Sequence, residues 1–264
     1  MDPMQAIILG LVQGLTEWLP ISSTGHLRIA ERLMSLQVPL LFDVTLHVAT
    51  LLVILLYFRT DVKNILLALV RRDFKSENGK LIPLIIVGTV PTALLGIVFG
   101  DALDTYFNSF LALGAGFVVS GVVLYVSKFS RETKDDVTYV DALVIGIAQG
   151  IALVPSVSRS GTTIAIALLL GISRKKAFKF SFLLSIPAVI GALGLTLYQQ
   201  EEAALALAGI GLTEIVVGCV ITSIVSFLAL KLLWKTLANK KFYLFAFYCW
   251  IIGVALVALS LSGF

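Results

Sequence analysis

Long apolar runs separated by short polar stretches dominate the chain. Five of these runs could cross a hydrocarbon core about 30 Å thick, which takes roughly 20 helical residues. They cover residues 81–100, 107–127, 177–198, 212–234 and 242–262. The run 42–58 is a shorter sixth candidate, and Arg59 at its end can reach the membrane interface. The pattern predicts an all-α, polytopic membrane protein with six transmembrane helices.

Two further segments show a different pattern, in which a polar break separates two short apolar arms. The first has arms at 4–18 and 26–36 around the break 19–25; the second has arms at 140–154 and 162–172 around the break 155–161. Arms of about 11 to 15 residues rise only roughly 16 to 22 Å, too little to cross the membrane alone. We therefore expect two re-entrant helical hairpins.

The two hairpin segments resemble each other at an offset of 136 positions. Gly10, Gln13, Gly14, Ser22 and Gly25 fall on Gly146, Gln149, Gly150, Ser158 and Gly161. Three predicted spans lie between the copies, so the second copy enters the membrane from the opposite side. This is the inverted-topology repeat of many transporters. We expect one membrane domain, 1–264, with repeat 1 at about 1–127 and repeat 2 at about 137–264.

Composition agrees with a lipid environment, because 58% of the residues are hydrophobic, 14% are charged and the mean hydropathy is +1.00. The net charge is +4, but 17 of the 20 basic residues are spread over the loops 59–80, 128–141, 174–179 and 231–241. This distribution argues against nucleic acid as a partner and reports topology instead. By the positive-inside rule these loops are cytoplasmic. The acidic linkers 101–106 and 199–211 are then external; their acids are Asp101, Asp104, Glu201 and Glu202.

The two polar breaks are expected to face each other near the membrane midplane. Irregular backbone survives at that depth only when it is buried in protein or lines a wet cavity. Hydroxyl residues stand where each second arm begins, as helix-capping residues do; they are Ser22, Ser23, Thr24, Ser158 and Ser160. Two helix N-termini directed into one cavity form an anion site.

Arg159 is the basic residue of the second break. A guanidinium at bilayer depth costs at least about 2.5 to 3.5 kcal/mol and normally marks function. Its planar fork suits two phosphate oxygens. The alternative is a structural ion pair with Glu17. That carboxylate lies four residues after Gln13, on the same helix face, where it could orient water, hold a divalent ion or act as a general base.

The two histidines are further candidates. His26 starts a half-helix beside three hydroxyl residues, and roles as general base and as nucleophile are both open. His47, on the first span, could equally be a core residue. Ser23 is a candidate nucleophile if His26 or Glu17 takes its proton, although helix capping also explains serine here.

Both breaks carry a resemblance to a known family. Residues 13–26 (Gln-Gly-Leu-Thr-Glu-Trp-Leu-Pro-Ile-Ser-Ser-Thr-Gly-His) and 155–163 (Pro-Ser-Val-Ser-Arg-Ser-Gly-Thr-Thr) resemble the two signature motifs of the undecaprenyl-diphosphatase, or bacitracin-resistance, family. The resemblance covers nearly the whole chain, including 180–187 (Phe-Ser-Phe-Leu-Leu-Ser-Ile-Pro). In two places the chain departs from the family pattern. Gln13 replaces a frequent glutamate, which weakens a paired-carboxylate mechanism, and Ser156 replaces a usual glycine.

The resemblance implies hydrolysis of undecaprenyl (long-chain polyprenyl) diphosphate to the monophosphate, which recycles the lipid carrier for cell-wall glycans. It implies catalytic roles for Glu17, Ser23, His26 and Arg159. We expect the substrate phosphates to be bound by the surrounding polar residues Gln13, Ser22, Thr24, Ser158, Ser160 and Thr163. A divalent cation, Mg²⁺ or Ca²⁺, is an expected cofactor with Glu17 as a ligand, and no organic cofactor is expected.

The expected location is the plasma membrane, with several passes and an active site facing the external side. The partner is the polyprenyl diphosphate lipid, and a homodimer stays open. The rival function is a lipid-phosphate flippase or secondary transporter using the same midplane anion site, because inverted repeats with broken helices also serve alternating access.

Overall fold

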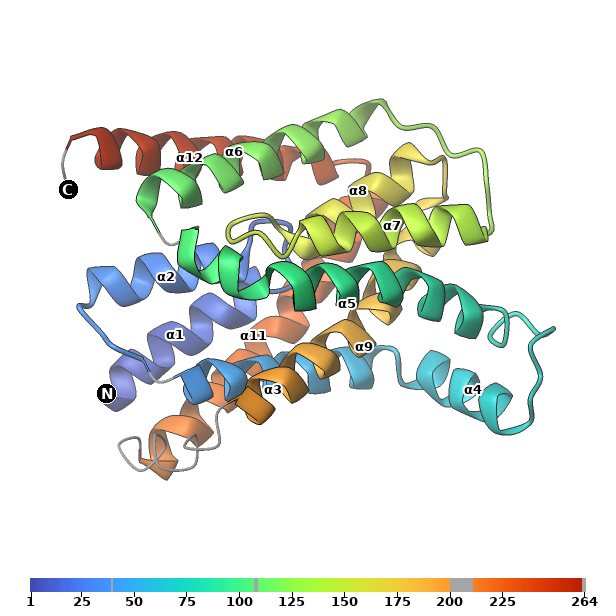
Figure 1. The fold of residues 1–264 in the computed structure, drawn as a ribbon, viewed down its shortest axis with the longest axis horizontal. Coiled ribbons are helices and arrows are strands. Elements are labelled where there is room, and N and C mark those ends of the chain that lie inside the picture. The colour runs from blue at the N-terminus through green and yellow to red at the C-terminus, as the bar shows by residue number, and fades with distance from the viewer. Residues whose placement is uncertain (39, 107–108, 200–210, 263–264) are drawn as a thin grey trace.

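A computed structural model describes residues 1–38, 40–106, 109–199 and 211–262, and its elements are helical (Figure 1). In chain order they are α1 (Pro3–Thr16), α2 (Ser23–Leu33), α3 (Leu40–Tyr57), α4 (Arg59–Val70), α5 (Leu81–Tyr106), α6 (Phe110–Val126), the 3₁₀ turn η1 (Ser127–Phe129), α7 (Tyr139–Ile151), α8 (Arg159–Leu169), α9 (Arg174–Gln199), α11 (Leu212–Ala238), the 3₁₀ turn η3 (Phe242–Leu244) and α12 (Phe245–Leu261). The prediction of an all-α protein is confirmed.

Five helical segments are long and apolar enough to span a membrane. They are Leu81–Gly100, Phe110–Phe129, Arg174–Leu195, Leu212–Ala238 and Phe242–Leu261. A sixth candidate is the pair α3 and α4, whose axes are bent by 80° at Phe58. The chain is therefore a multi-pass membrane protein, and the predicted runs match these segments closely.

The expected loop 59–80 is wrong in its first half, because Arg59–Val70 forms helix α4. Its apolar residues recur at helical spacing, and Val62 and Ile65 pack against the main core. An ion pair of 2.5 Å between Asp61 and Lys179 ties α4 to α9. The basic charge in this segment did not prevent a helix, because charged side chains occupy its exposed face.

The expected linker 101–106 is helical, since α5 continues to Tyr106 and carries Asp101 and Asp104 in its last turns; its external location stays a prediction. A helix can extend past its apolar run once it reaches the membrane interface, where water hydrates charged side chains. Glu201 and Glu202 of the other acidic linker lie outside the described residues.

Helices α7 and α8 begin 136 residues after α1 and α2, which is the offset found in the sequence. The capping also matches. Asp2 and Gln5 form a capping box at the start of α1, and Thr138 and Asp141 form one at the start of α7. Ser22 and Ser158, again 136 apart, cap α2 and α8. The similarity thus extends from sequence to the local hydrogen bonds that begin each helix.

Helices of the two halves pack in a crossed pattern. Helix α1 lies against α11, where the Thr222 hydroxyl donates to the Gly10 carbonyl at 3.1 Å. Helix α7 lies against α5, where the Thr92 hydroxyl donates to the Gly146 carbonyl at 2.9 Å. In both contacts a glycine permits close backbone approach and a threonine of the neighbouring helix bonds to its carbonyl.

The two breaks meet in the middle of the bundle, between α2 and α8 (Figure 1). A Cβ added to Gly25 would lie 2.8 Å from the Ser156 hydroxyl, and one added to Gly161 would lie 3.0 Å from Pro20. Both glycines are therefore needed for the close approach of the breaks. The two breaks therefore contact each other as expected, and their position near the membrane midplane stays a prediction.

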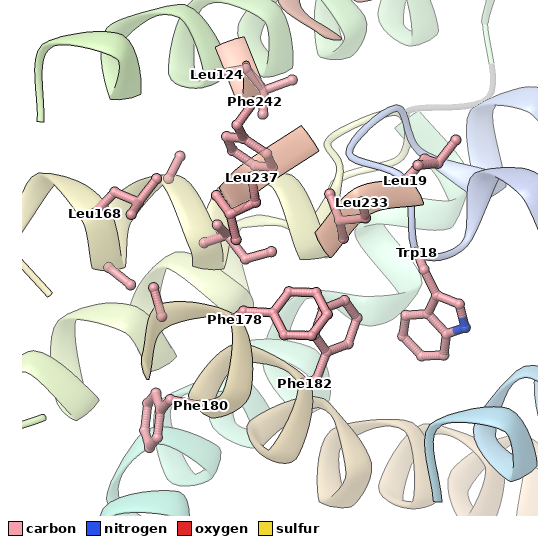
Figure 2. Packing of buried hydrophobic residues seen from close by; sticks show 14 of the residues in the cluster. Trp18, Leu19, Leu124, Leu168, Phe178, Phe180, Phe182, Leu233, Leu237 and Phe242 are labelled. Atoms are coloured by element: carbon pink, nitrogen blue, oxygen red, sulfur yellow. The ribbon is translucent and has the colours of Figure 1, made fainter. Parts of the chain in front are cut away.

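Aromatic side chains of α9 cover one side of the first break. The Trp18 ring lies edge-on to Phe182 with centroids 5.4 Å apart, and Phe178 contacts Phe182 at 4.6 Å (Figure 2). All three side chains are buried. This packing holds the irregular backbone around residue 18 away from lipid.

Candidate active site between the two helix breaks

Glu17 is the centre of a hydrogen-bonded group at the first break. It caps the C-terminal end of α1, and its side chain is only 2% exposed. The Gln13 amide donates to Glu17 Oε2 at 3.1 Å, as the four-residue spacing predicted, and the Ser23 hydroxyl donates to the same oxygen at 2.6 Å. A buried carboxylate needs such partners, because desolvation of an unpaired charge is costly.

Arg159 reaches Glu17 from the second break. Its Nη2 atom lies 2.6 Å from Glu17 Oε1, and its side chain is 24% exposed. Among the described residues, its other guanidinium N–H groups have no hydrogen-bond acceptor. The ion pair that the sequence left as an alternative is therefore present, yet most of the guanidinium fork stays available to an anion.

His47 joins the same group. Its Nε2 lies 3.7 Å from Glu17 Oε2, and its Nδ1 donates to the Asp43 carbonyl at 2.8 Å. A carbonyl can only accept, so this contact places the proton of neutral His47 on Nδ1. Nε2 is then the ring atom directed toward Glu17. The structure thus brings His47 to Glu17, 30 residues away in the sequence.

His26 lies in a separate set of contacts. Its Nδ1 donates to the Ser22 carbonyl at 2.7 Å, and its Nε2 accepts from the Tyr248 hydroxyl at 2.7 Å. The ring also packs edge-on against Phe117 at 5.1 Å. Within the described contacts, His26 is not bonded to Ser23 or Glu17. Tyr248 is a residue that sequence reasoning missed, because nothing in an apolar span identifies which aromatic residue faces the site.

The hydroxyl residues of the breaks serve mostly as caps. Ser22 accepts from the Gly25 amide, and Ser158 accepts from the Gly161 amide at 3.1 Å. Thr163 bonds to carbonyls of its own helix, and Ser160 donates weakly to the Leu19 carbonyl at 3.4 Å. Thr24 is exposed. These residues lie in or beside the breaks that hold Glu17 and Arg159, and their contacts with phosphate stay a prediction.

The second break is held by Ser120 of α6, another residue that the sequence did not single out. Its hydroxyl donates to the Ser156 carbonyl at 3.2 Å and accepts from the Ser158 amide at 2.9 Å. Ser156 has φ +68°, a left-handed conformation that glycine adopts without strain. This explains why glycine is usual at a position of this geometry.

A small cavity opens beside Arg159. Its lining consists of Trp18, Arg159, Ser160, Thr163, Ser181, Phe182 and Ser185. Trp18 Nε1 and Ser181 Oγ are buried polar atoms without a hydrogen-bond partner among the described protein groups. Buried donors without partners are rare, so they indicate a place where a water or an anionic oxygen binds. Both residues lie in the segments that carried the sequence resemblance.

A metal ion is less directly supported. Within the described part of the chain, no three His, Cys, Asp or Glu side chains are grouped as metal ligands. However, Gln13 Oε1 is buried beside Glu17 without a partner, which supplies one amide oxygen next to one carboxylate. Mg²⁺ is often held by one or two protein oxygens together with substrate phosphates. Gln13 and Glu17 therefore fit a Mg²⁺ ion whose remaining ligands are oxygens of the substrate phosphates.

The fold and site together define a class. This is a multi-pass helical membrane protein in which two broken helical segments bring a carboxylate, a guanidinium and a serine together, and helix α3 adds a histidine. Residues 6–255 match the family described as Bacitracin resistance protein BacA. The chain belongs to this family.

Several relatives are similar over their full length, and each is named undecaprenyl-diphosphatase. The protein of Carboxydothermus hydrogenoformans is 42% identical, covering 100% of this chain and 99% of the relative. The protein of Methanosphaera stadtmanae is 38% identical, with 98% and 99% covered. That of Halothermothrix orenii is 37% identical with the same coverage. The family resemblance in the sequence is confirmed.

Proposed function

We propose that this protein is an undecaprenyl-diphosphatase, which hydrolyses the lipid diphosphate to the lipid monophosphate and inorganic phosphate and so returns the carrier to cell-wall glycan synthesis. The observation that carries this proposal is the contact of Glu17 with both Ser23 and Arg159, across the two breaks. Full-length similarity to relatives of that name supports the substrate.

Arg159 binds the terminal phosphoryl group in this proposal. Phosphoryl transfer depends on positioning and on neutralising charge over the phosphoryl oxygens. The N–H groups of Arg159 that Glu17 leaves free suit two of those oxygens. The amides at the starts of α2 and α8 and the unpartnered Ser181 and Trp18 donors add to the binding of anionic oxygens.

Ser23 is the nucleophile that the geometry favours. Its hydroxyl proton already points at Glu17 Oε2, so the carboxylate takes this proton as Ser23 Oγ attacks the terminal phosphorus. The bond from that phosphorus to the bridging oxygen breaks, and the lipid monophosphate leaves. Water then cleaves the phosphoserine, which releases inorganic phosphate and restores the serine hydroxyl.

His26 receives the proton of that water. With Nδ1–H donated to the Ser22 carbonyl, Nε2 carries the lone pair and is the basic atom. In the resting site this lone pair accepts a hydrogen bond from the Tyr248 hydroxyl at 2.7 Å, which orients the ring; the attacking water replaces that hydroxyl at Nε2 before its proton moves. A divalent cation, if bound, would be held by Glu17 and Gln13 Oε1 and would supply further neutralisation of the diphosphate charge.

The membrane arrangement that accompanies this function is an inverted repeat of two re-entrant hairpins, α1–α2 and α7–α8. The shared offset of 136, the paired capping boxes and the crossed packing of α1 on α11 and α7 on α5 support it. The basic segments, taken as cytoplasmic, support an active site that opens on the external side. The prenyl tail stays in lipid while the diphosphate enters between the breaks.

Phosphate release by purified protein tests the proposal. We expect the native chain in detergent to release phosphate from a long-chain polyprenyl diphosphate, and Arg159→Ala to lose roughly a hundredfold or more of kcat/KM. Arg71→Ala removes an exposed arginine elsewhere and is expected to retain full activity. Folded native protein without release above background would contradict the enzyme and favour lipid transport, which sealed vesicles can measure.

Tyr248→Phe tests the role assigned to His26. Removing the hydrogen bond to Nε2 is expected to lower kcat about fivefold and to leave KM nearly unchanged. A fivefold change in kcat corresponds to about 1 kcal/mol of activation free energy, the usual net contribution of one hydrogen bond. The pH profile of kcat should shift, because the basic nitrogen loses its partner. A variant with native kcat and an unaltered pH profile would exclude Tyr248 as a positioning residue. Tyr139→Phe serves as the matched control at an exposed tyrosine away from His26.

A further inference from the structure

A second polar cavity lies at the end of the bundle that carries the basic segments. Its volume is about 420 Å³. Its lining includes the basic residues Lys128, Arg131, Arg174 and Lys240, together with Glu132 and Ser130. Two buried core residues that Figure 2 labels, Leu168 and Phe242, also border it. Leu168 and Arg159 lie near opposite ends of α8, about 14 Å apart along the helix, so this cavity is separate from the site at the breaks.

The cavity carries an excess of positive charge. Four of its lining residues are basic, and Glu132 is its one acid. Glu132 pairs with Arg174, which leaves Lys128, Arg131 and Lys240 without a carboxylate partner among the described ion pairs. These three residues are exposed and line the same hollow, so their charges add to the positive potential in it. An anion bound in the hollow is attracted by all three.

An unpartnered hydroxyl adds a second, independent sign of a ligand. Ser130 Oγ is buried and has no hydrogen-bond partner among the described groups, although Ser130 lines the cavity. Neighbouring Ser127 differs, because its hydroxyl donates to the Leu124 carbonyl at 2.6 Å. A phosphate oxygen can accept a hydrogen bond from a hydroxyl and from a lysine or arginine N–H. A buried hydroxyl without a partner, in the same cavity as unpaired cations, is therefore suited to phosphate.

The surroundings favour a lipid as the source of that phosphate. Lys128 lies over the rings of Tyr243 and Tyr125, at 4.9 and 5.6 Å from their centroids. The Tyr125 ring packs edge-on against the ring of Phe247 of α12, which is 47% exposed. Val122 of α6 is similarly exposed, at 48%. A cationic hollow thus opens beside a face of α6 and α12 that lipid chains contact.

From these contacts we propose that the cavity binds the phosphate of an anionic lipid headgroup in the leaflet on the basic side of the membrane. Lys128, Arg131 and Lys240 supply the charge, Ser130 donates a hydrogen bond, and the acyl chains lie along α6 and α12. This site is distinct from the proposed diphosphate site and does not depend on hydrolysis.

Lipid binding by native mass spectrometry tests this assignment. Protein in a non-ionic detergent is titrated with dioleoyl phosphatidic acid, dioleoyl phosphatidylcholine or inorganic phosphate. We expect Lys128→Gln/Lys240→Gln to weaken phosphatidic acid binding at least about tenfold, since each cation near a headgroup is worth about 1 kcal/mol. Lys75→Gln/Lys235→Gln removes the same charge from exposed sites outside the cavity and should bind as the native chain does.

A further variant guards against a folding defect. Ser130→Leu fills the hollow without changing charge and is expected to weaken binding similarly while native elution and thermal unfolding are kept. Equal weakening in the control pair would overturn the assignment, because bulk charge would then explain the binding. Equal affinity for phosphatidylcholine would overturn it too. Displacement of the lipid by inorganic phosphate at matched concentration would show a site for a free anion instead.

Discussion

Glu17→Gln is expected to lower the rate of phosphate release at least about a hundredfold, with the folded protein retained. The amide keeps the size of the side chain and can still bond to Ser23. It cannot take the Ser23 proton, and it leaves Arg159 without its counter-charge. The measurement is kcat/KM for a long-chain polyprenyl diphosphate, with elution profile and thermal unfolding recorded alongside.

Glu31→Gln provides the matched control, because Glu31 is a buried glutamate at the far end of α2, paired with Arg28 at 3.8 Å. It should keep activity within about twofold of native. Combining Glu17→Gln with Arg159→Ala should cost little more than either change alone, since both disable one unit. Native activity in Glu17→Gln would remove the carboxylate from the mechanism.

Gly146→Ala is expected to destabilise the protein by about 3 kcal/mol, through a clash between two helices. A Cβ at this position would lie 2.1 Å from the Gly88 carbonyl oxygen of α5. That oxygen belongs to backbone, so relief requires α5 and α7 to separate. Separation would also break the Thr92 bond to the Gly146 carbonyl. The free energy of unfolding in mixed micelles, or the Tm in detergent, measures the effect.

Gly191→Ala is the control for helix propensity. Nothing lies within 4 Å of a Cβ added to this glycine of α9, so alanine should be neutral or stabilise by up to about 1 kcal/mol. Equal stability of the two variants would show that the α5–α7 contact tolerates separation. Loss of stability in Gly146→Ala alone supports glycine-mediated helix packing in the membrane.

Part of the site could be read from local spacing. Gln13 and Glu17 are four residues apart on one helix, so their contact at 3.1 Å follows from helical geometry. Ser22 and Ser158 were recognised as caps because hydroxyl residues at helix starts satisfy free amides. The pairing of Arg159 with Glu17 was raised as an alternative, because a buried charge at membrane depth needs a partner.

Other contacts could not be predicted, because they join residues far apart in the chain. Tyr248 meets His26 across 222 positions, and Ser120 meets Ser158 across 38. Each hydroxyl lies in an apolar span with several similar residues. Which of them faces the site depends on the rotation of α12 and α6 about their axes. That rotation is set by packing such as the contact of Gly114 with Gly253.

The sequence by itself determined the membrane class, the spans, the two breaks and their kinship at 136 positions, because hydrophobic length and helix capping act over a few neighbouring residues. Long-range packing sets the 80° bend between α3 and α4, the contact of His47 with Glu17 and the contact of His26 with Tyr248. These outcomes depend on how closely packed helices approach and rotate, and no local pattern encodes that geometry.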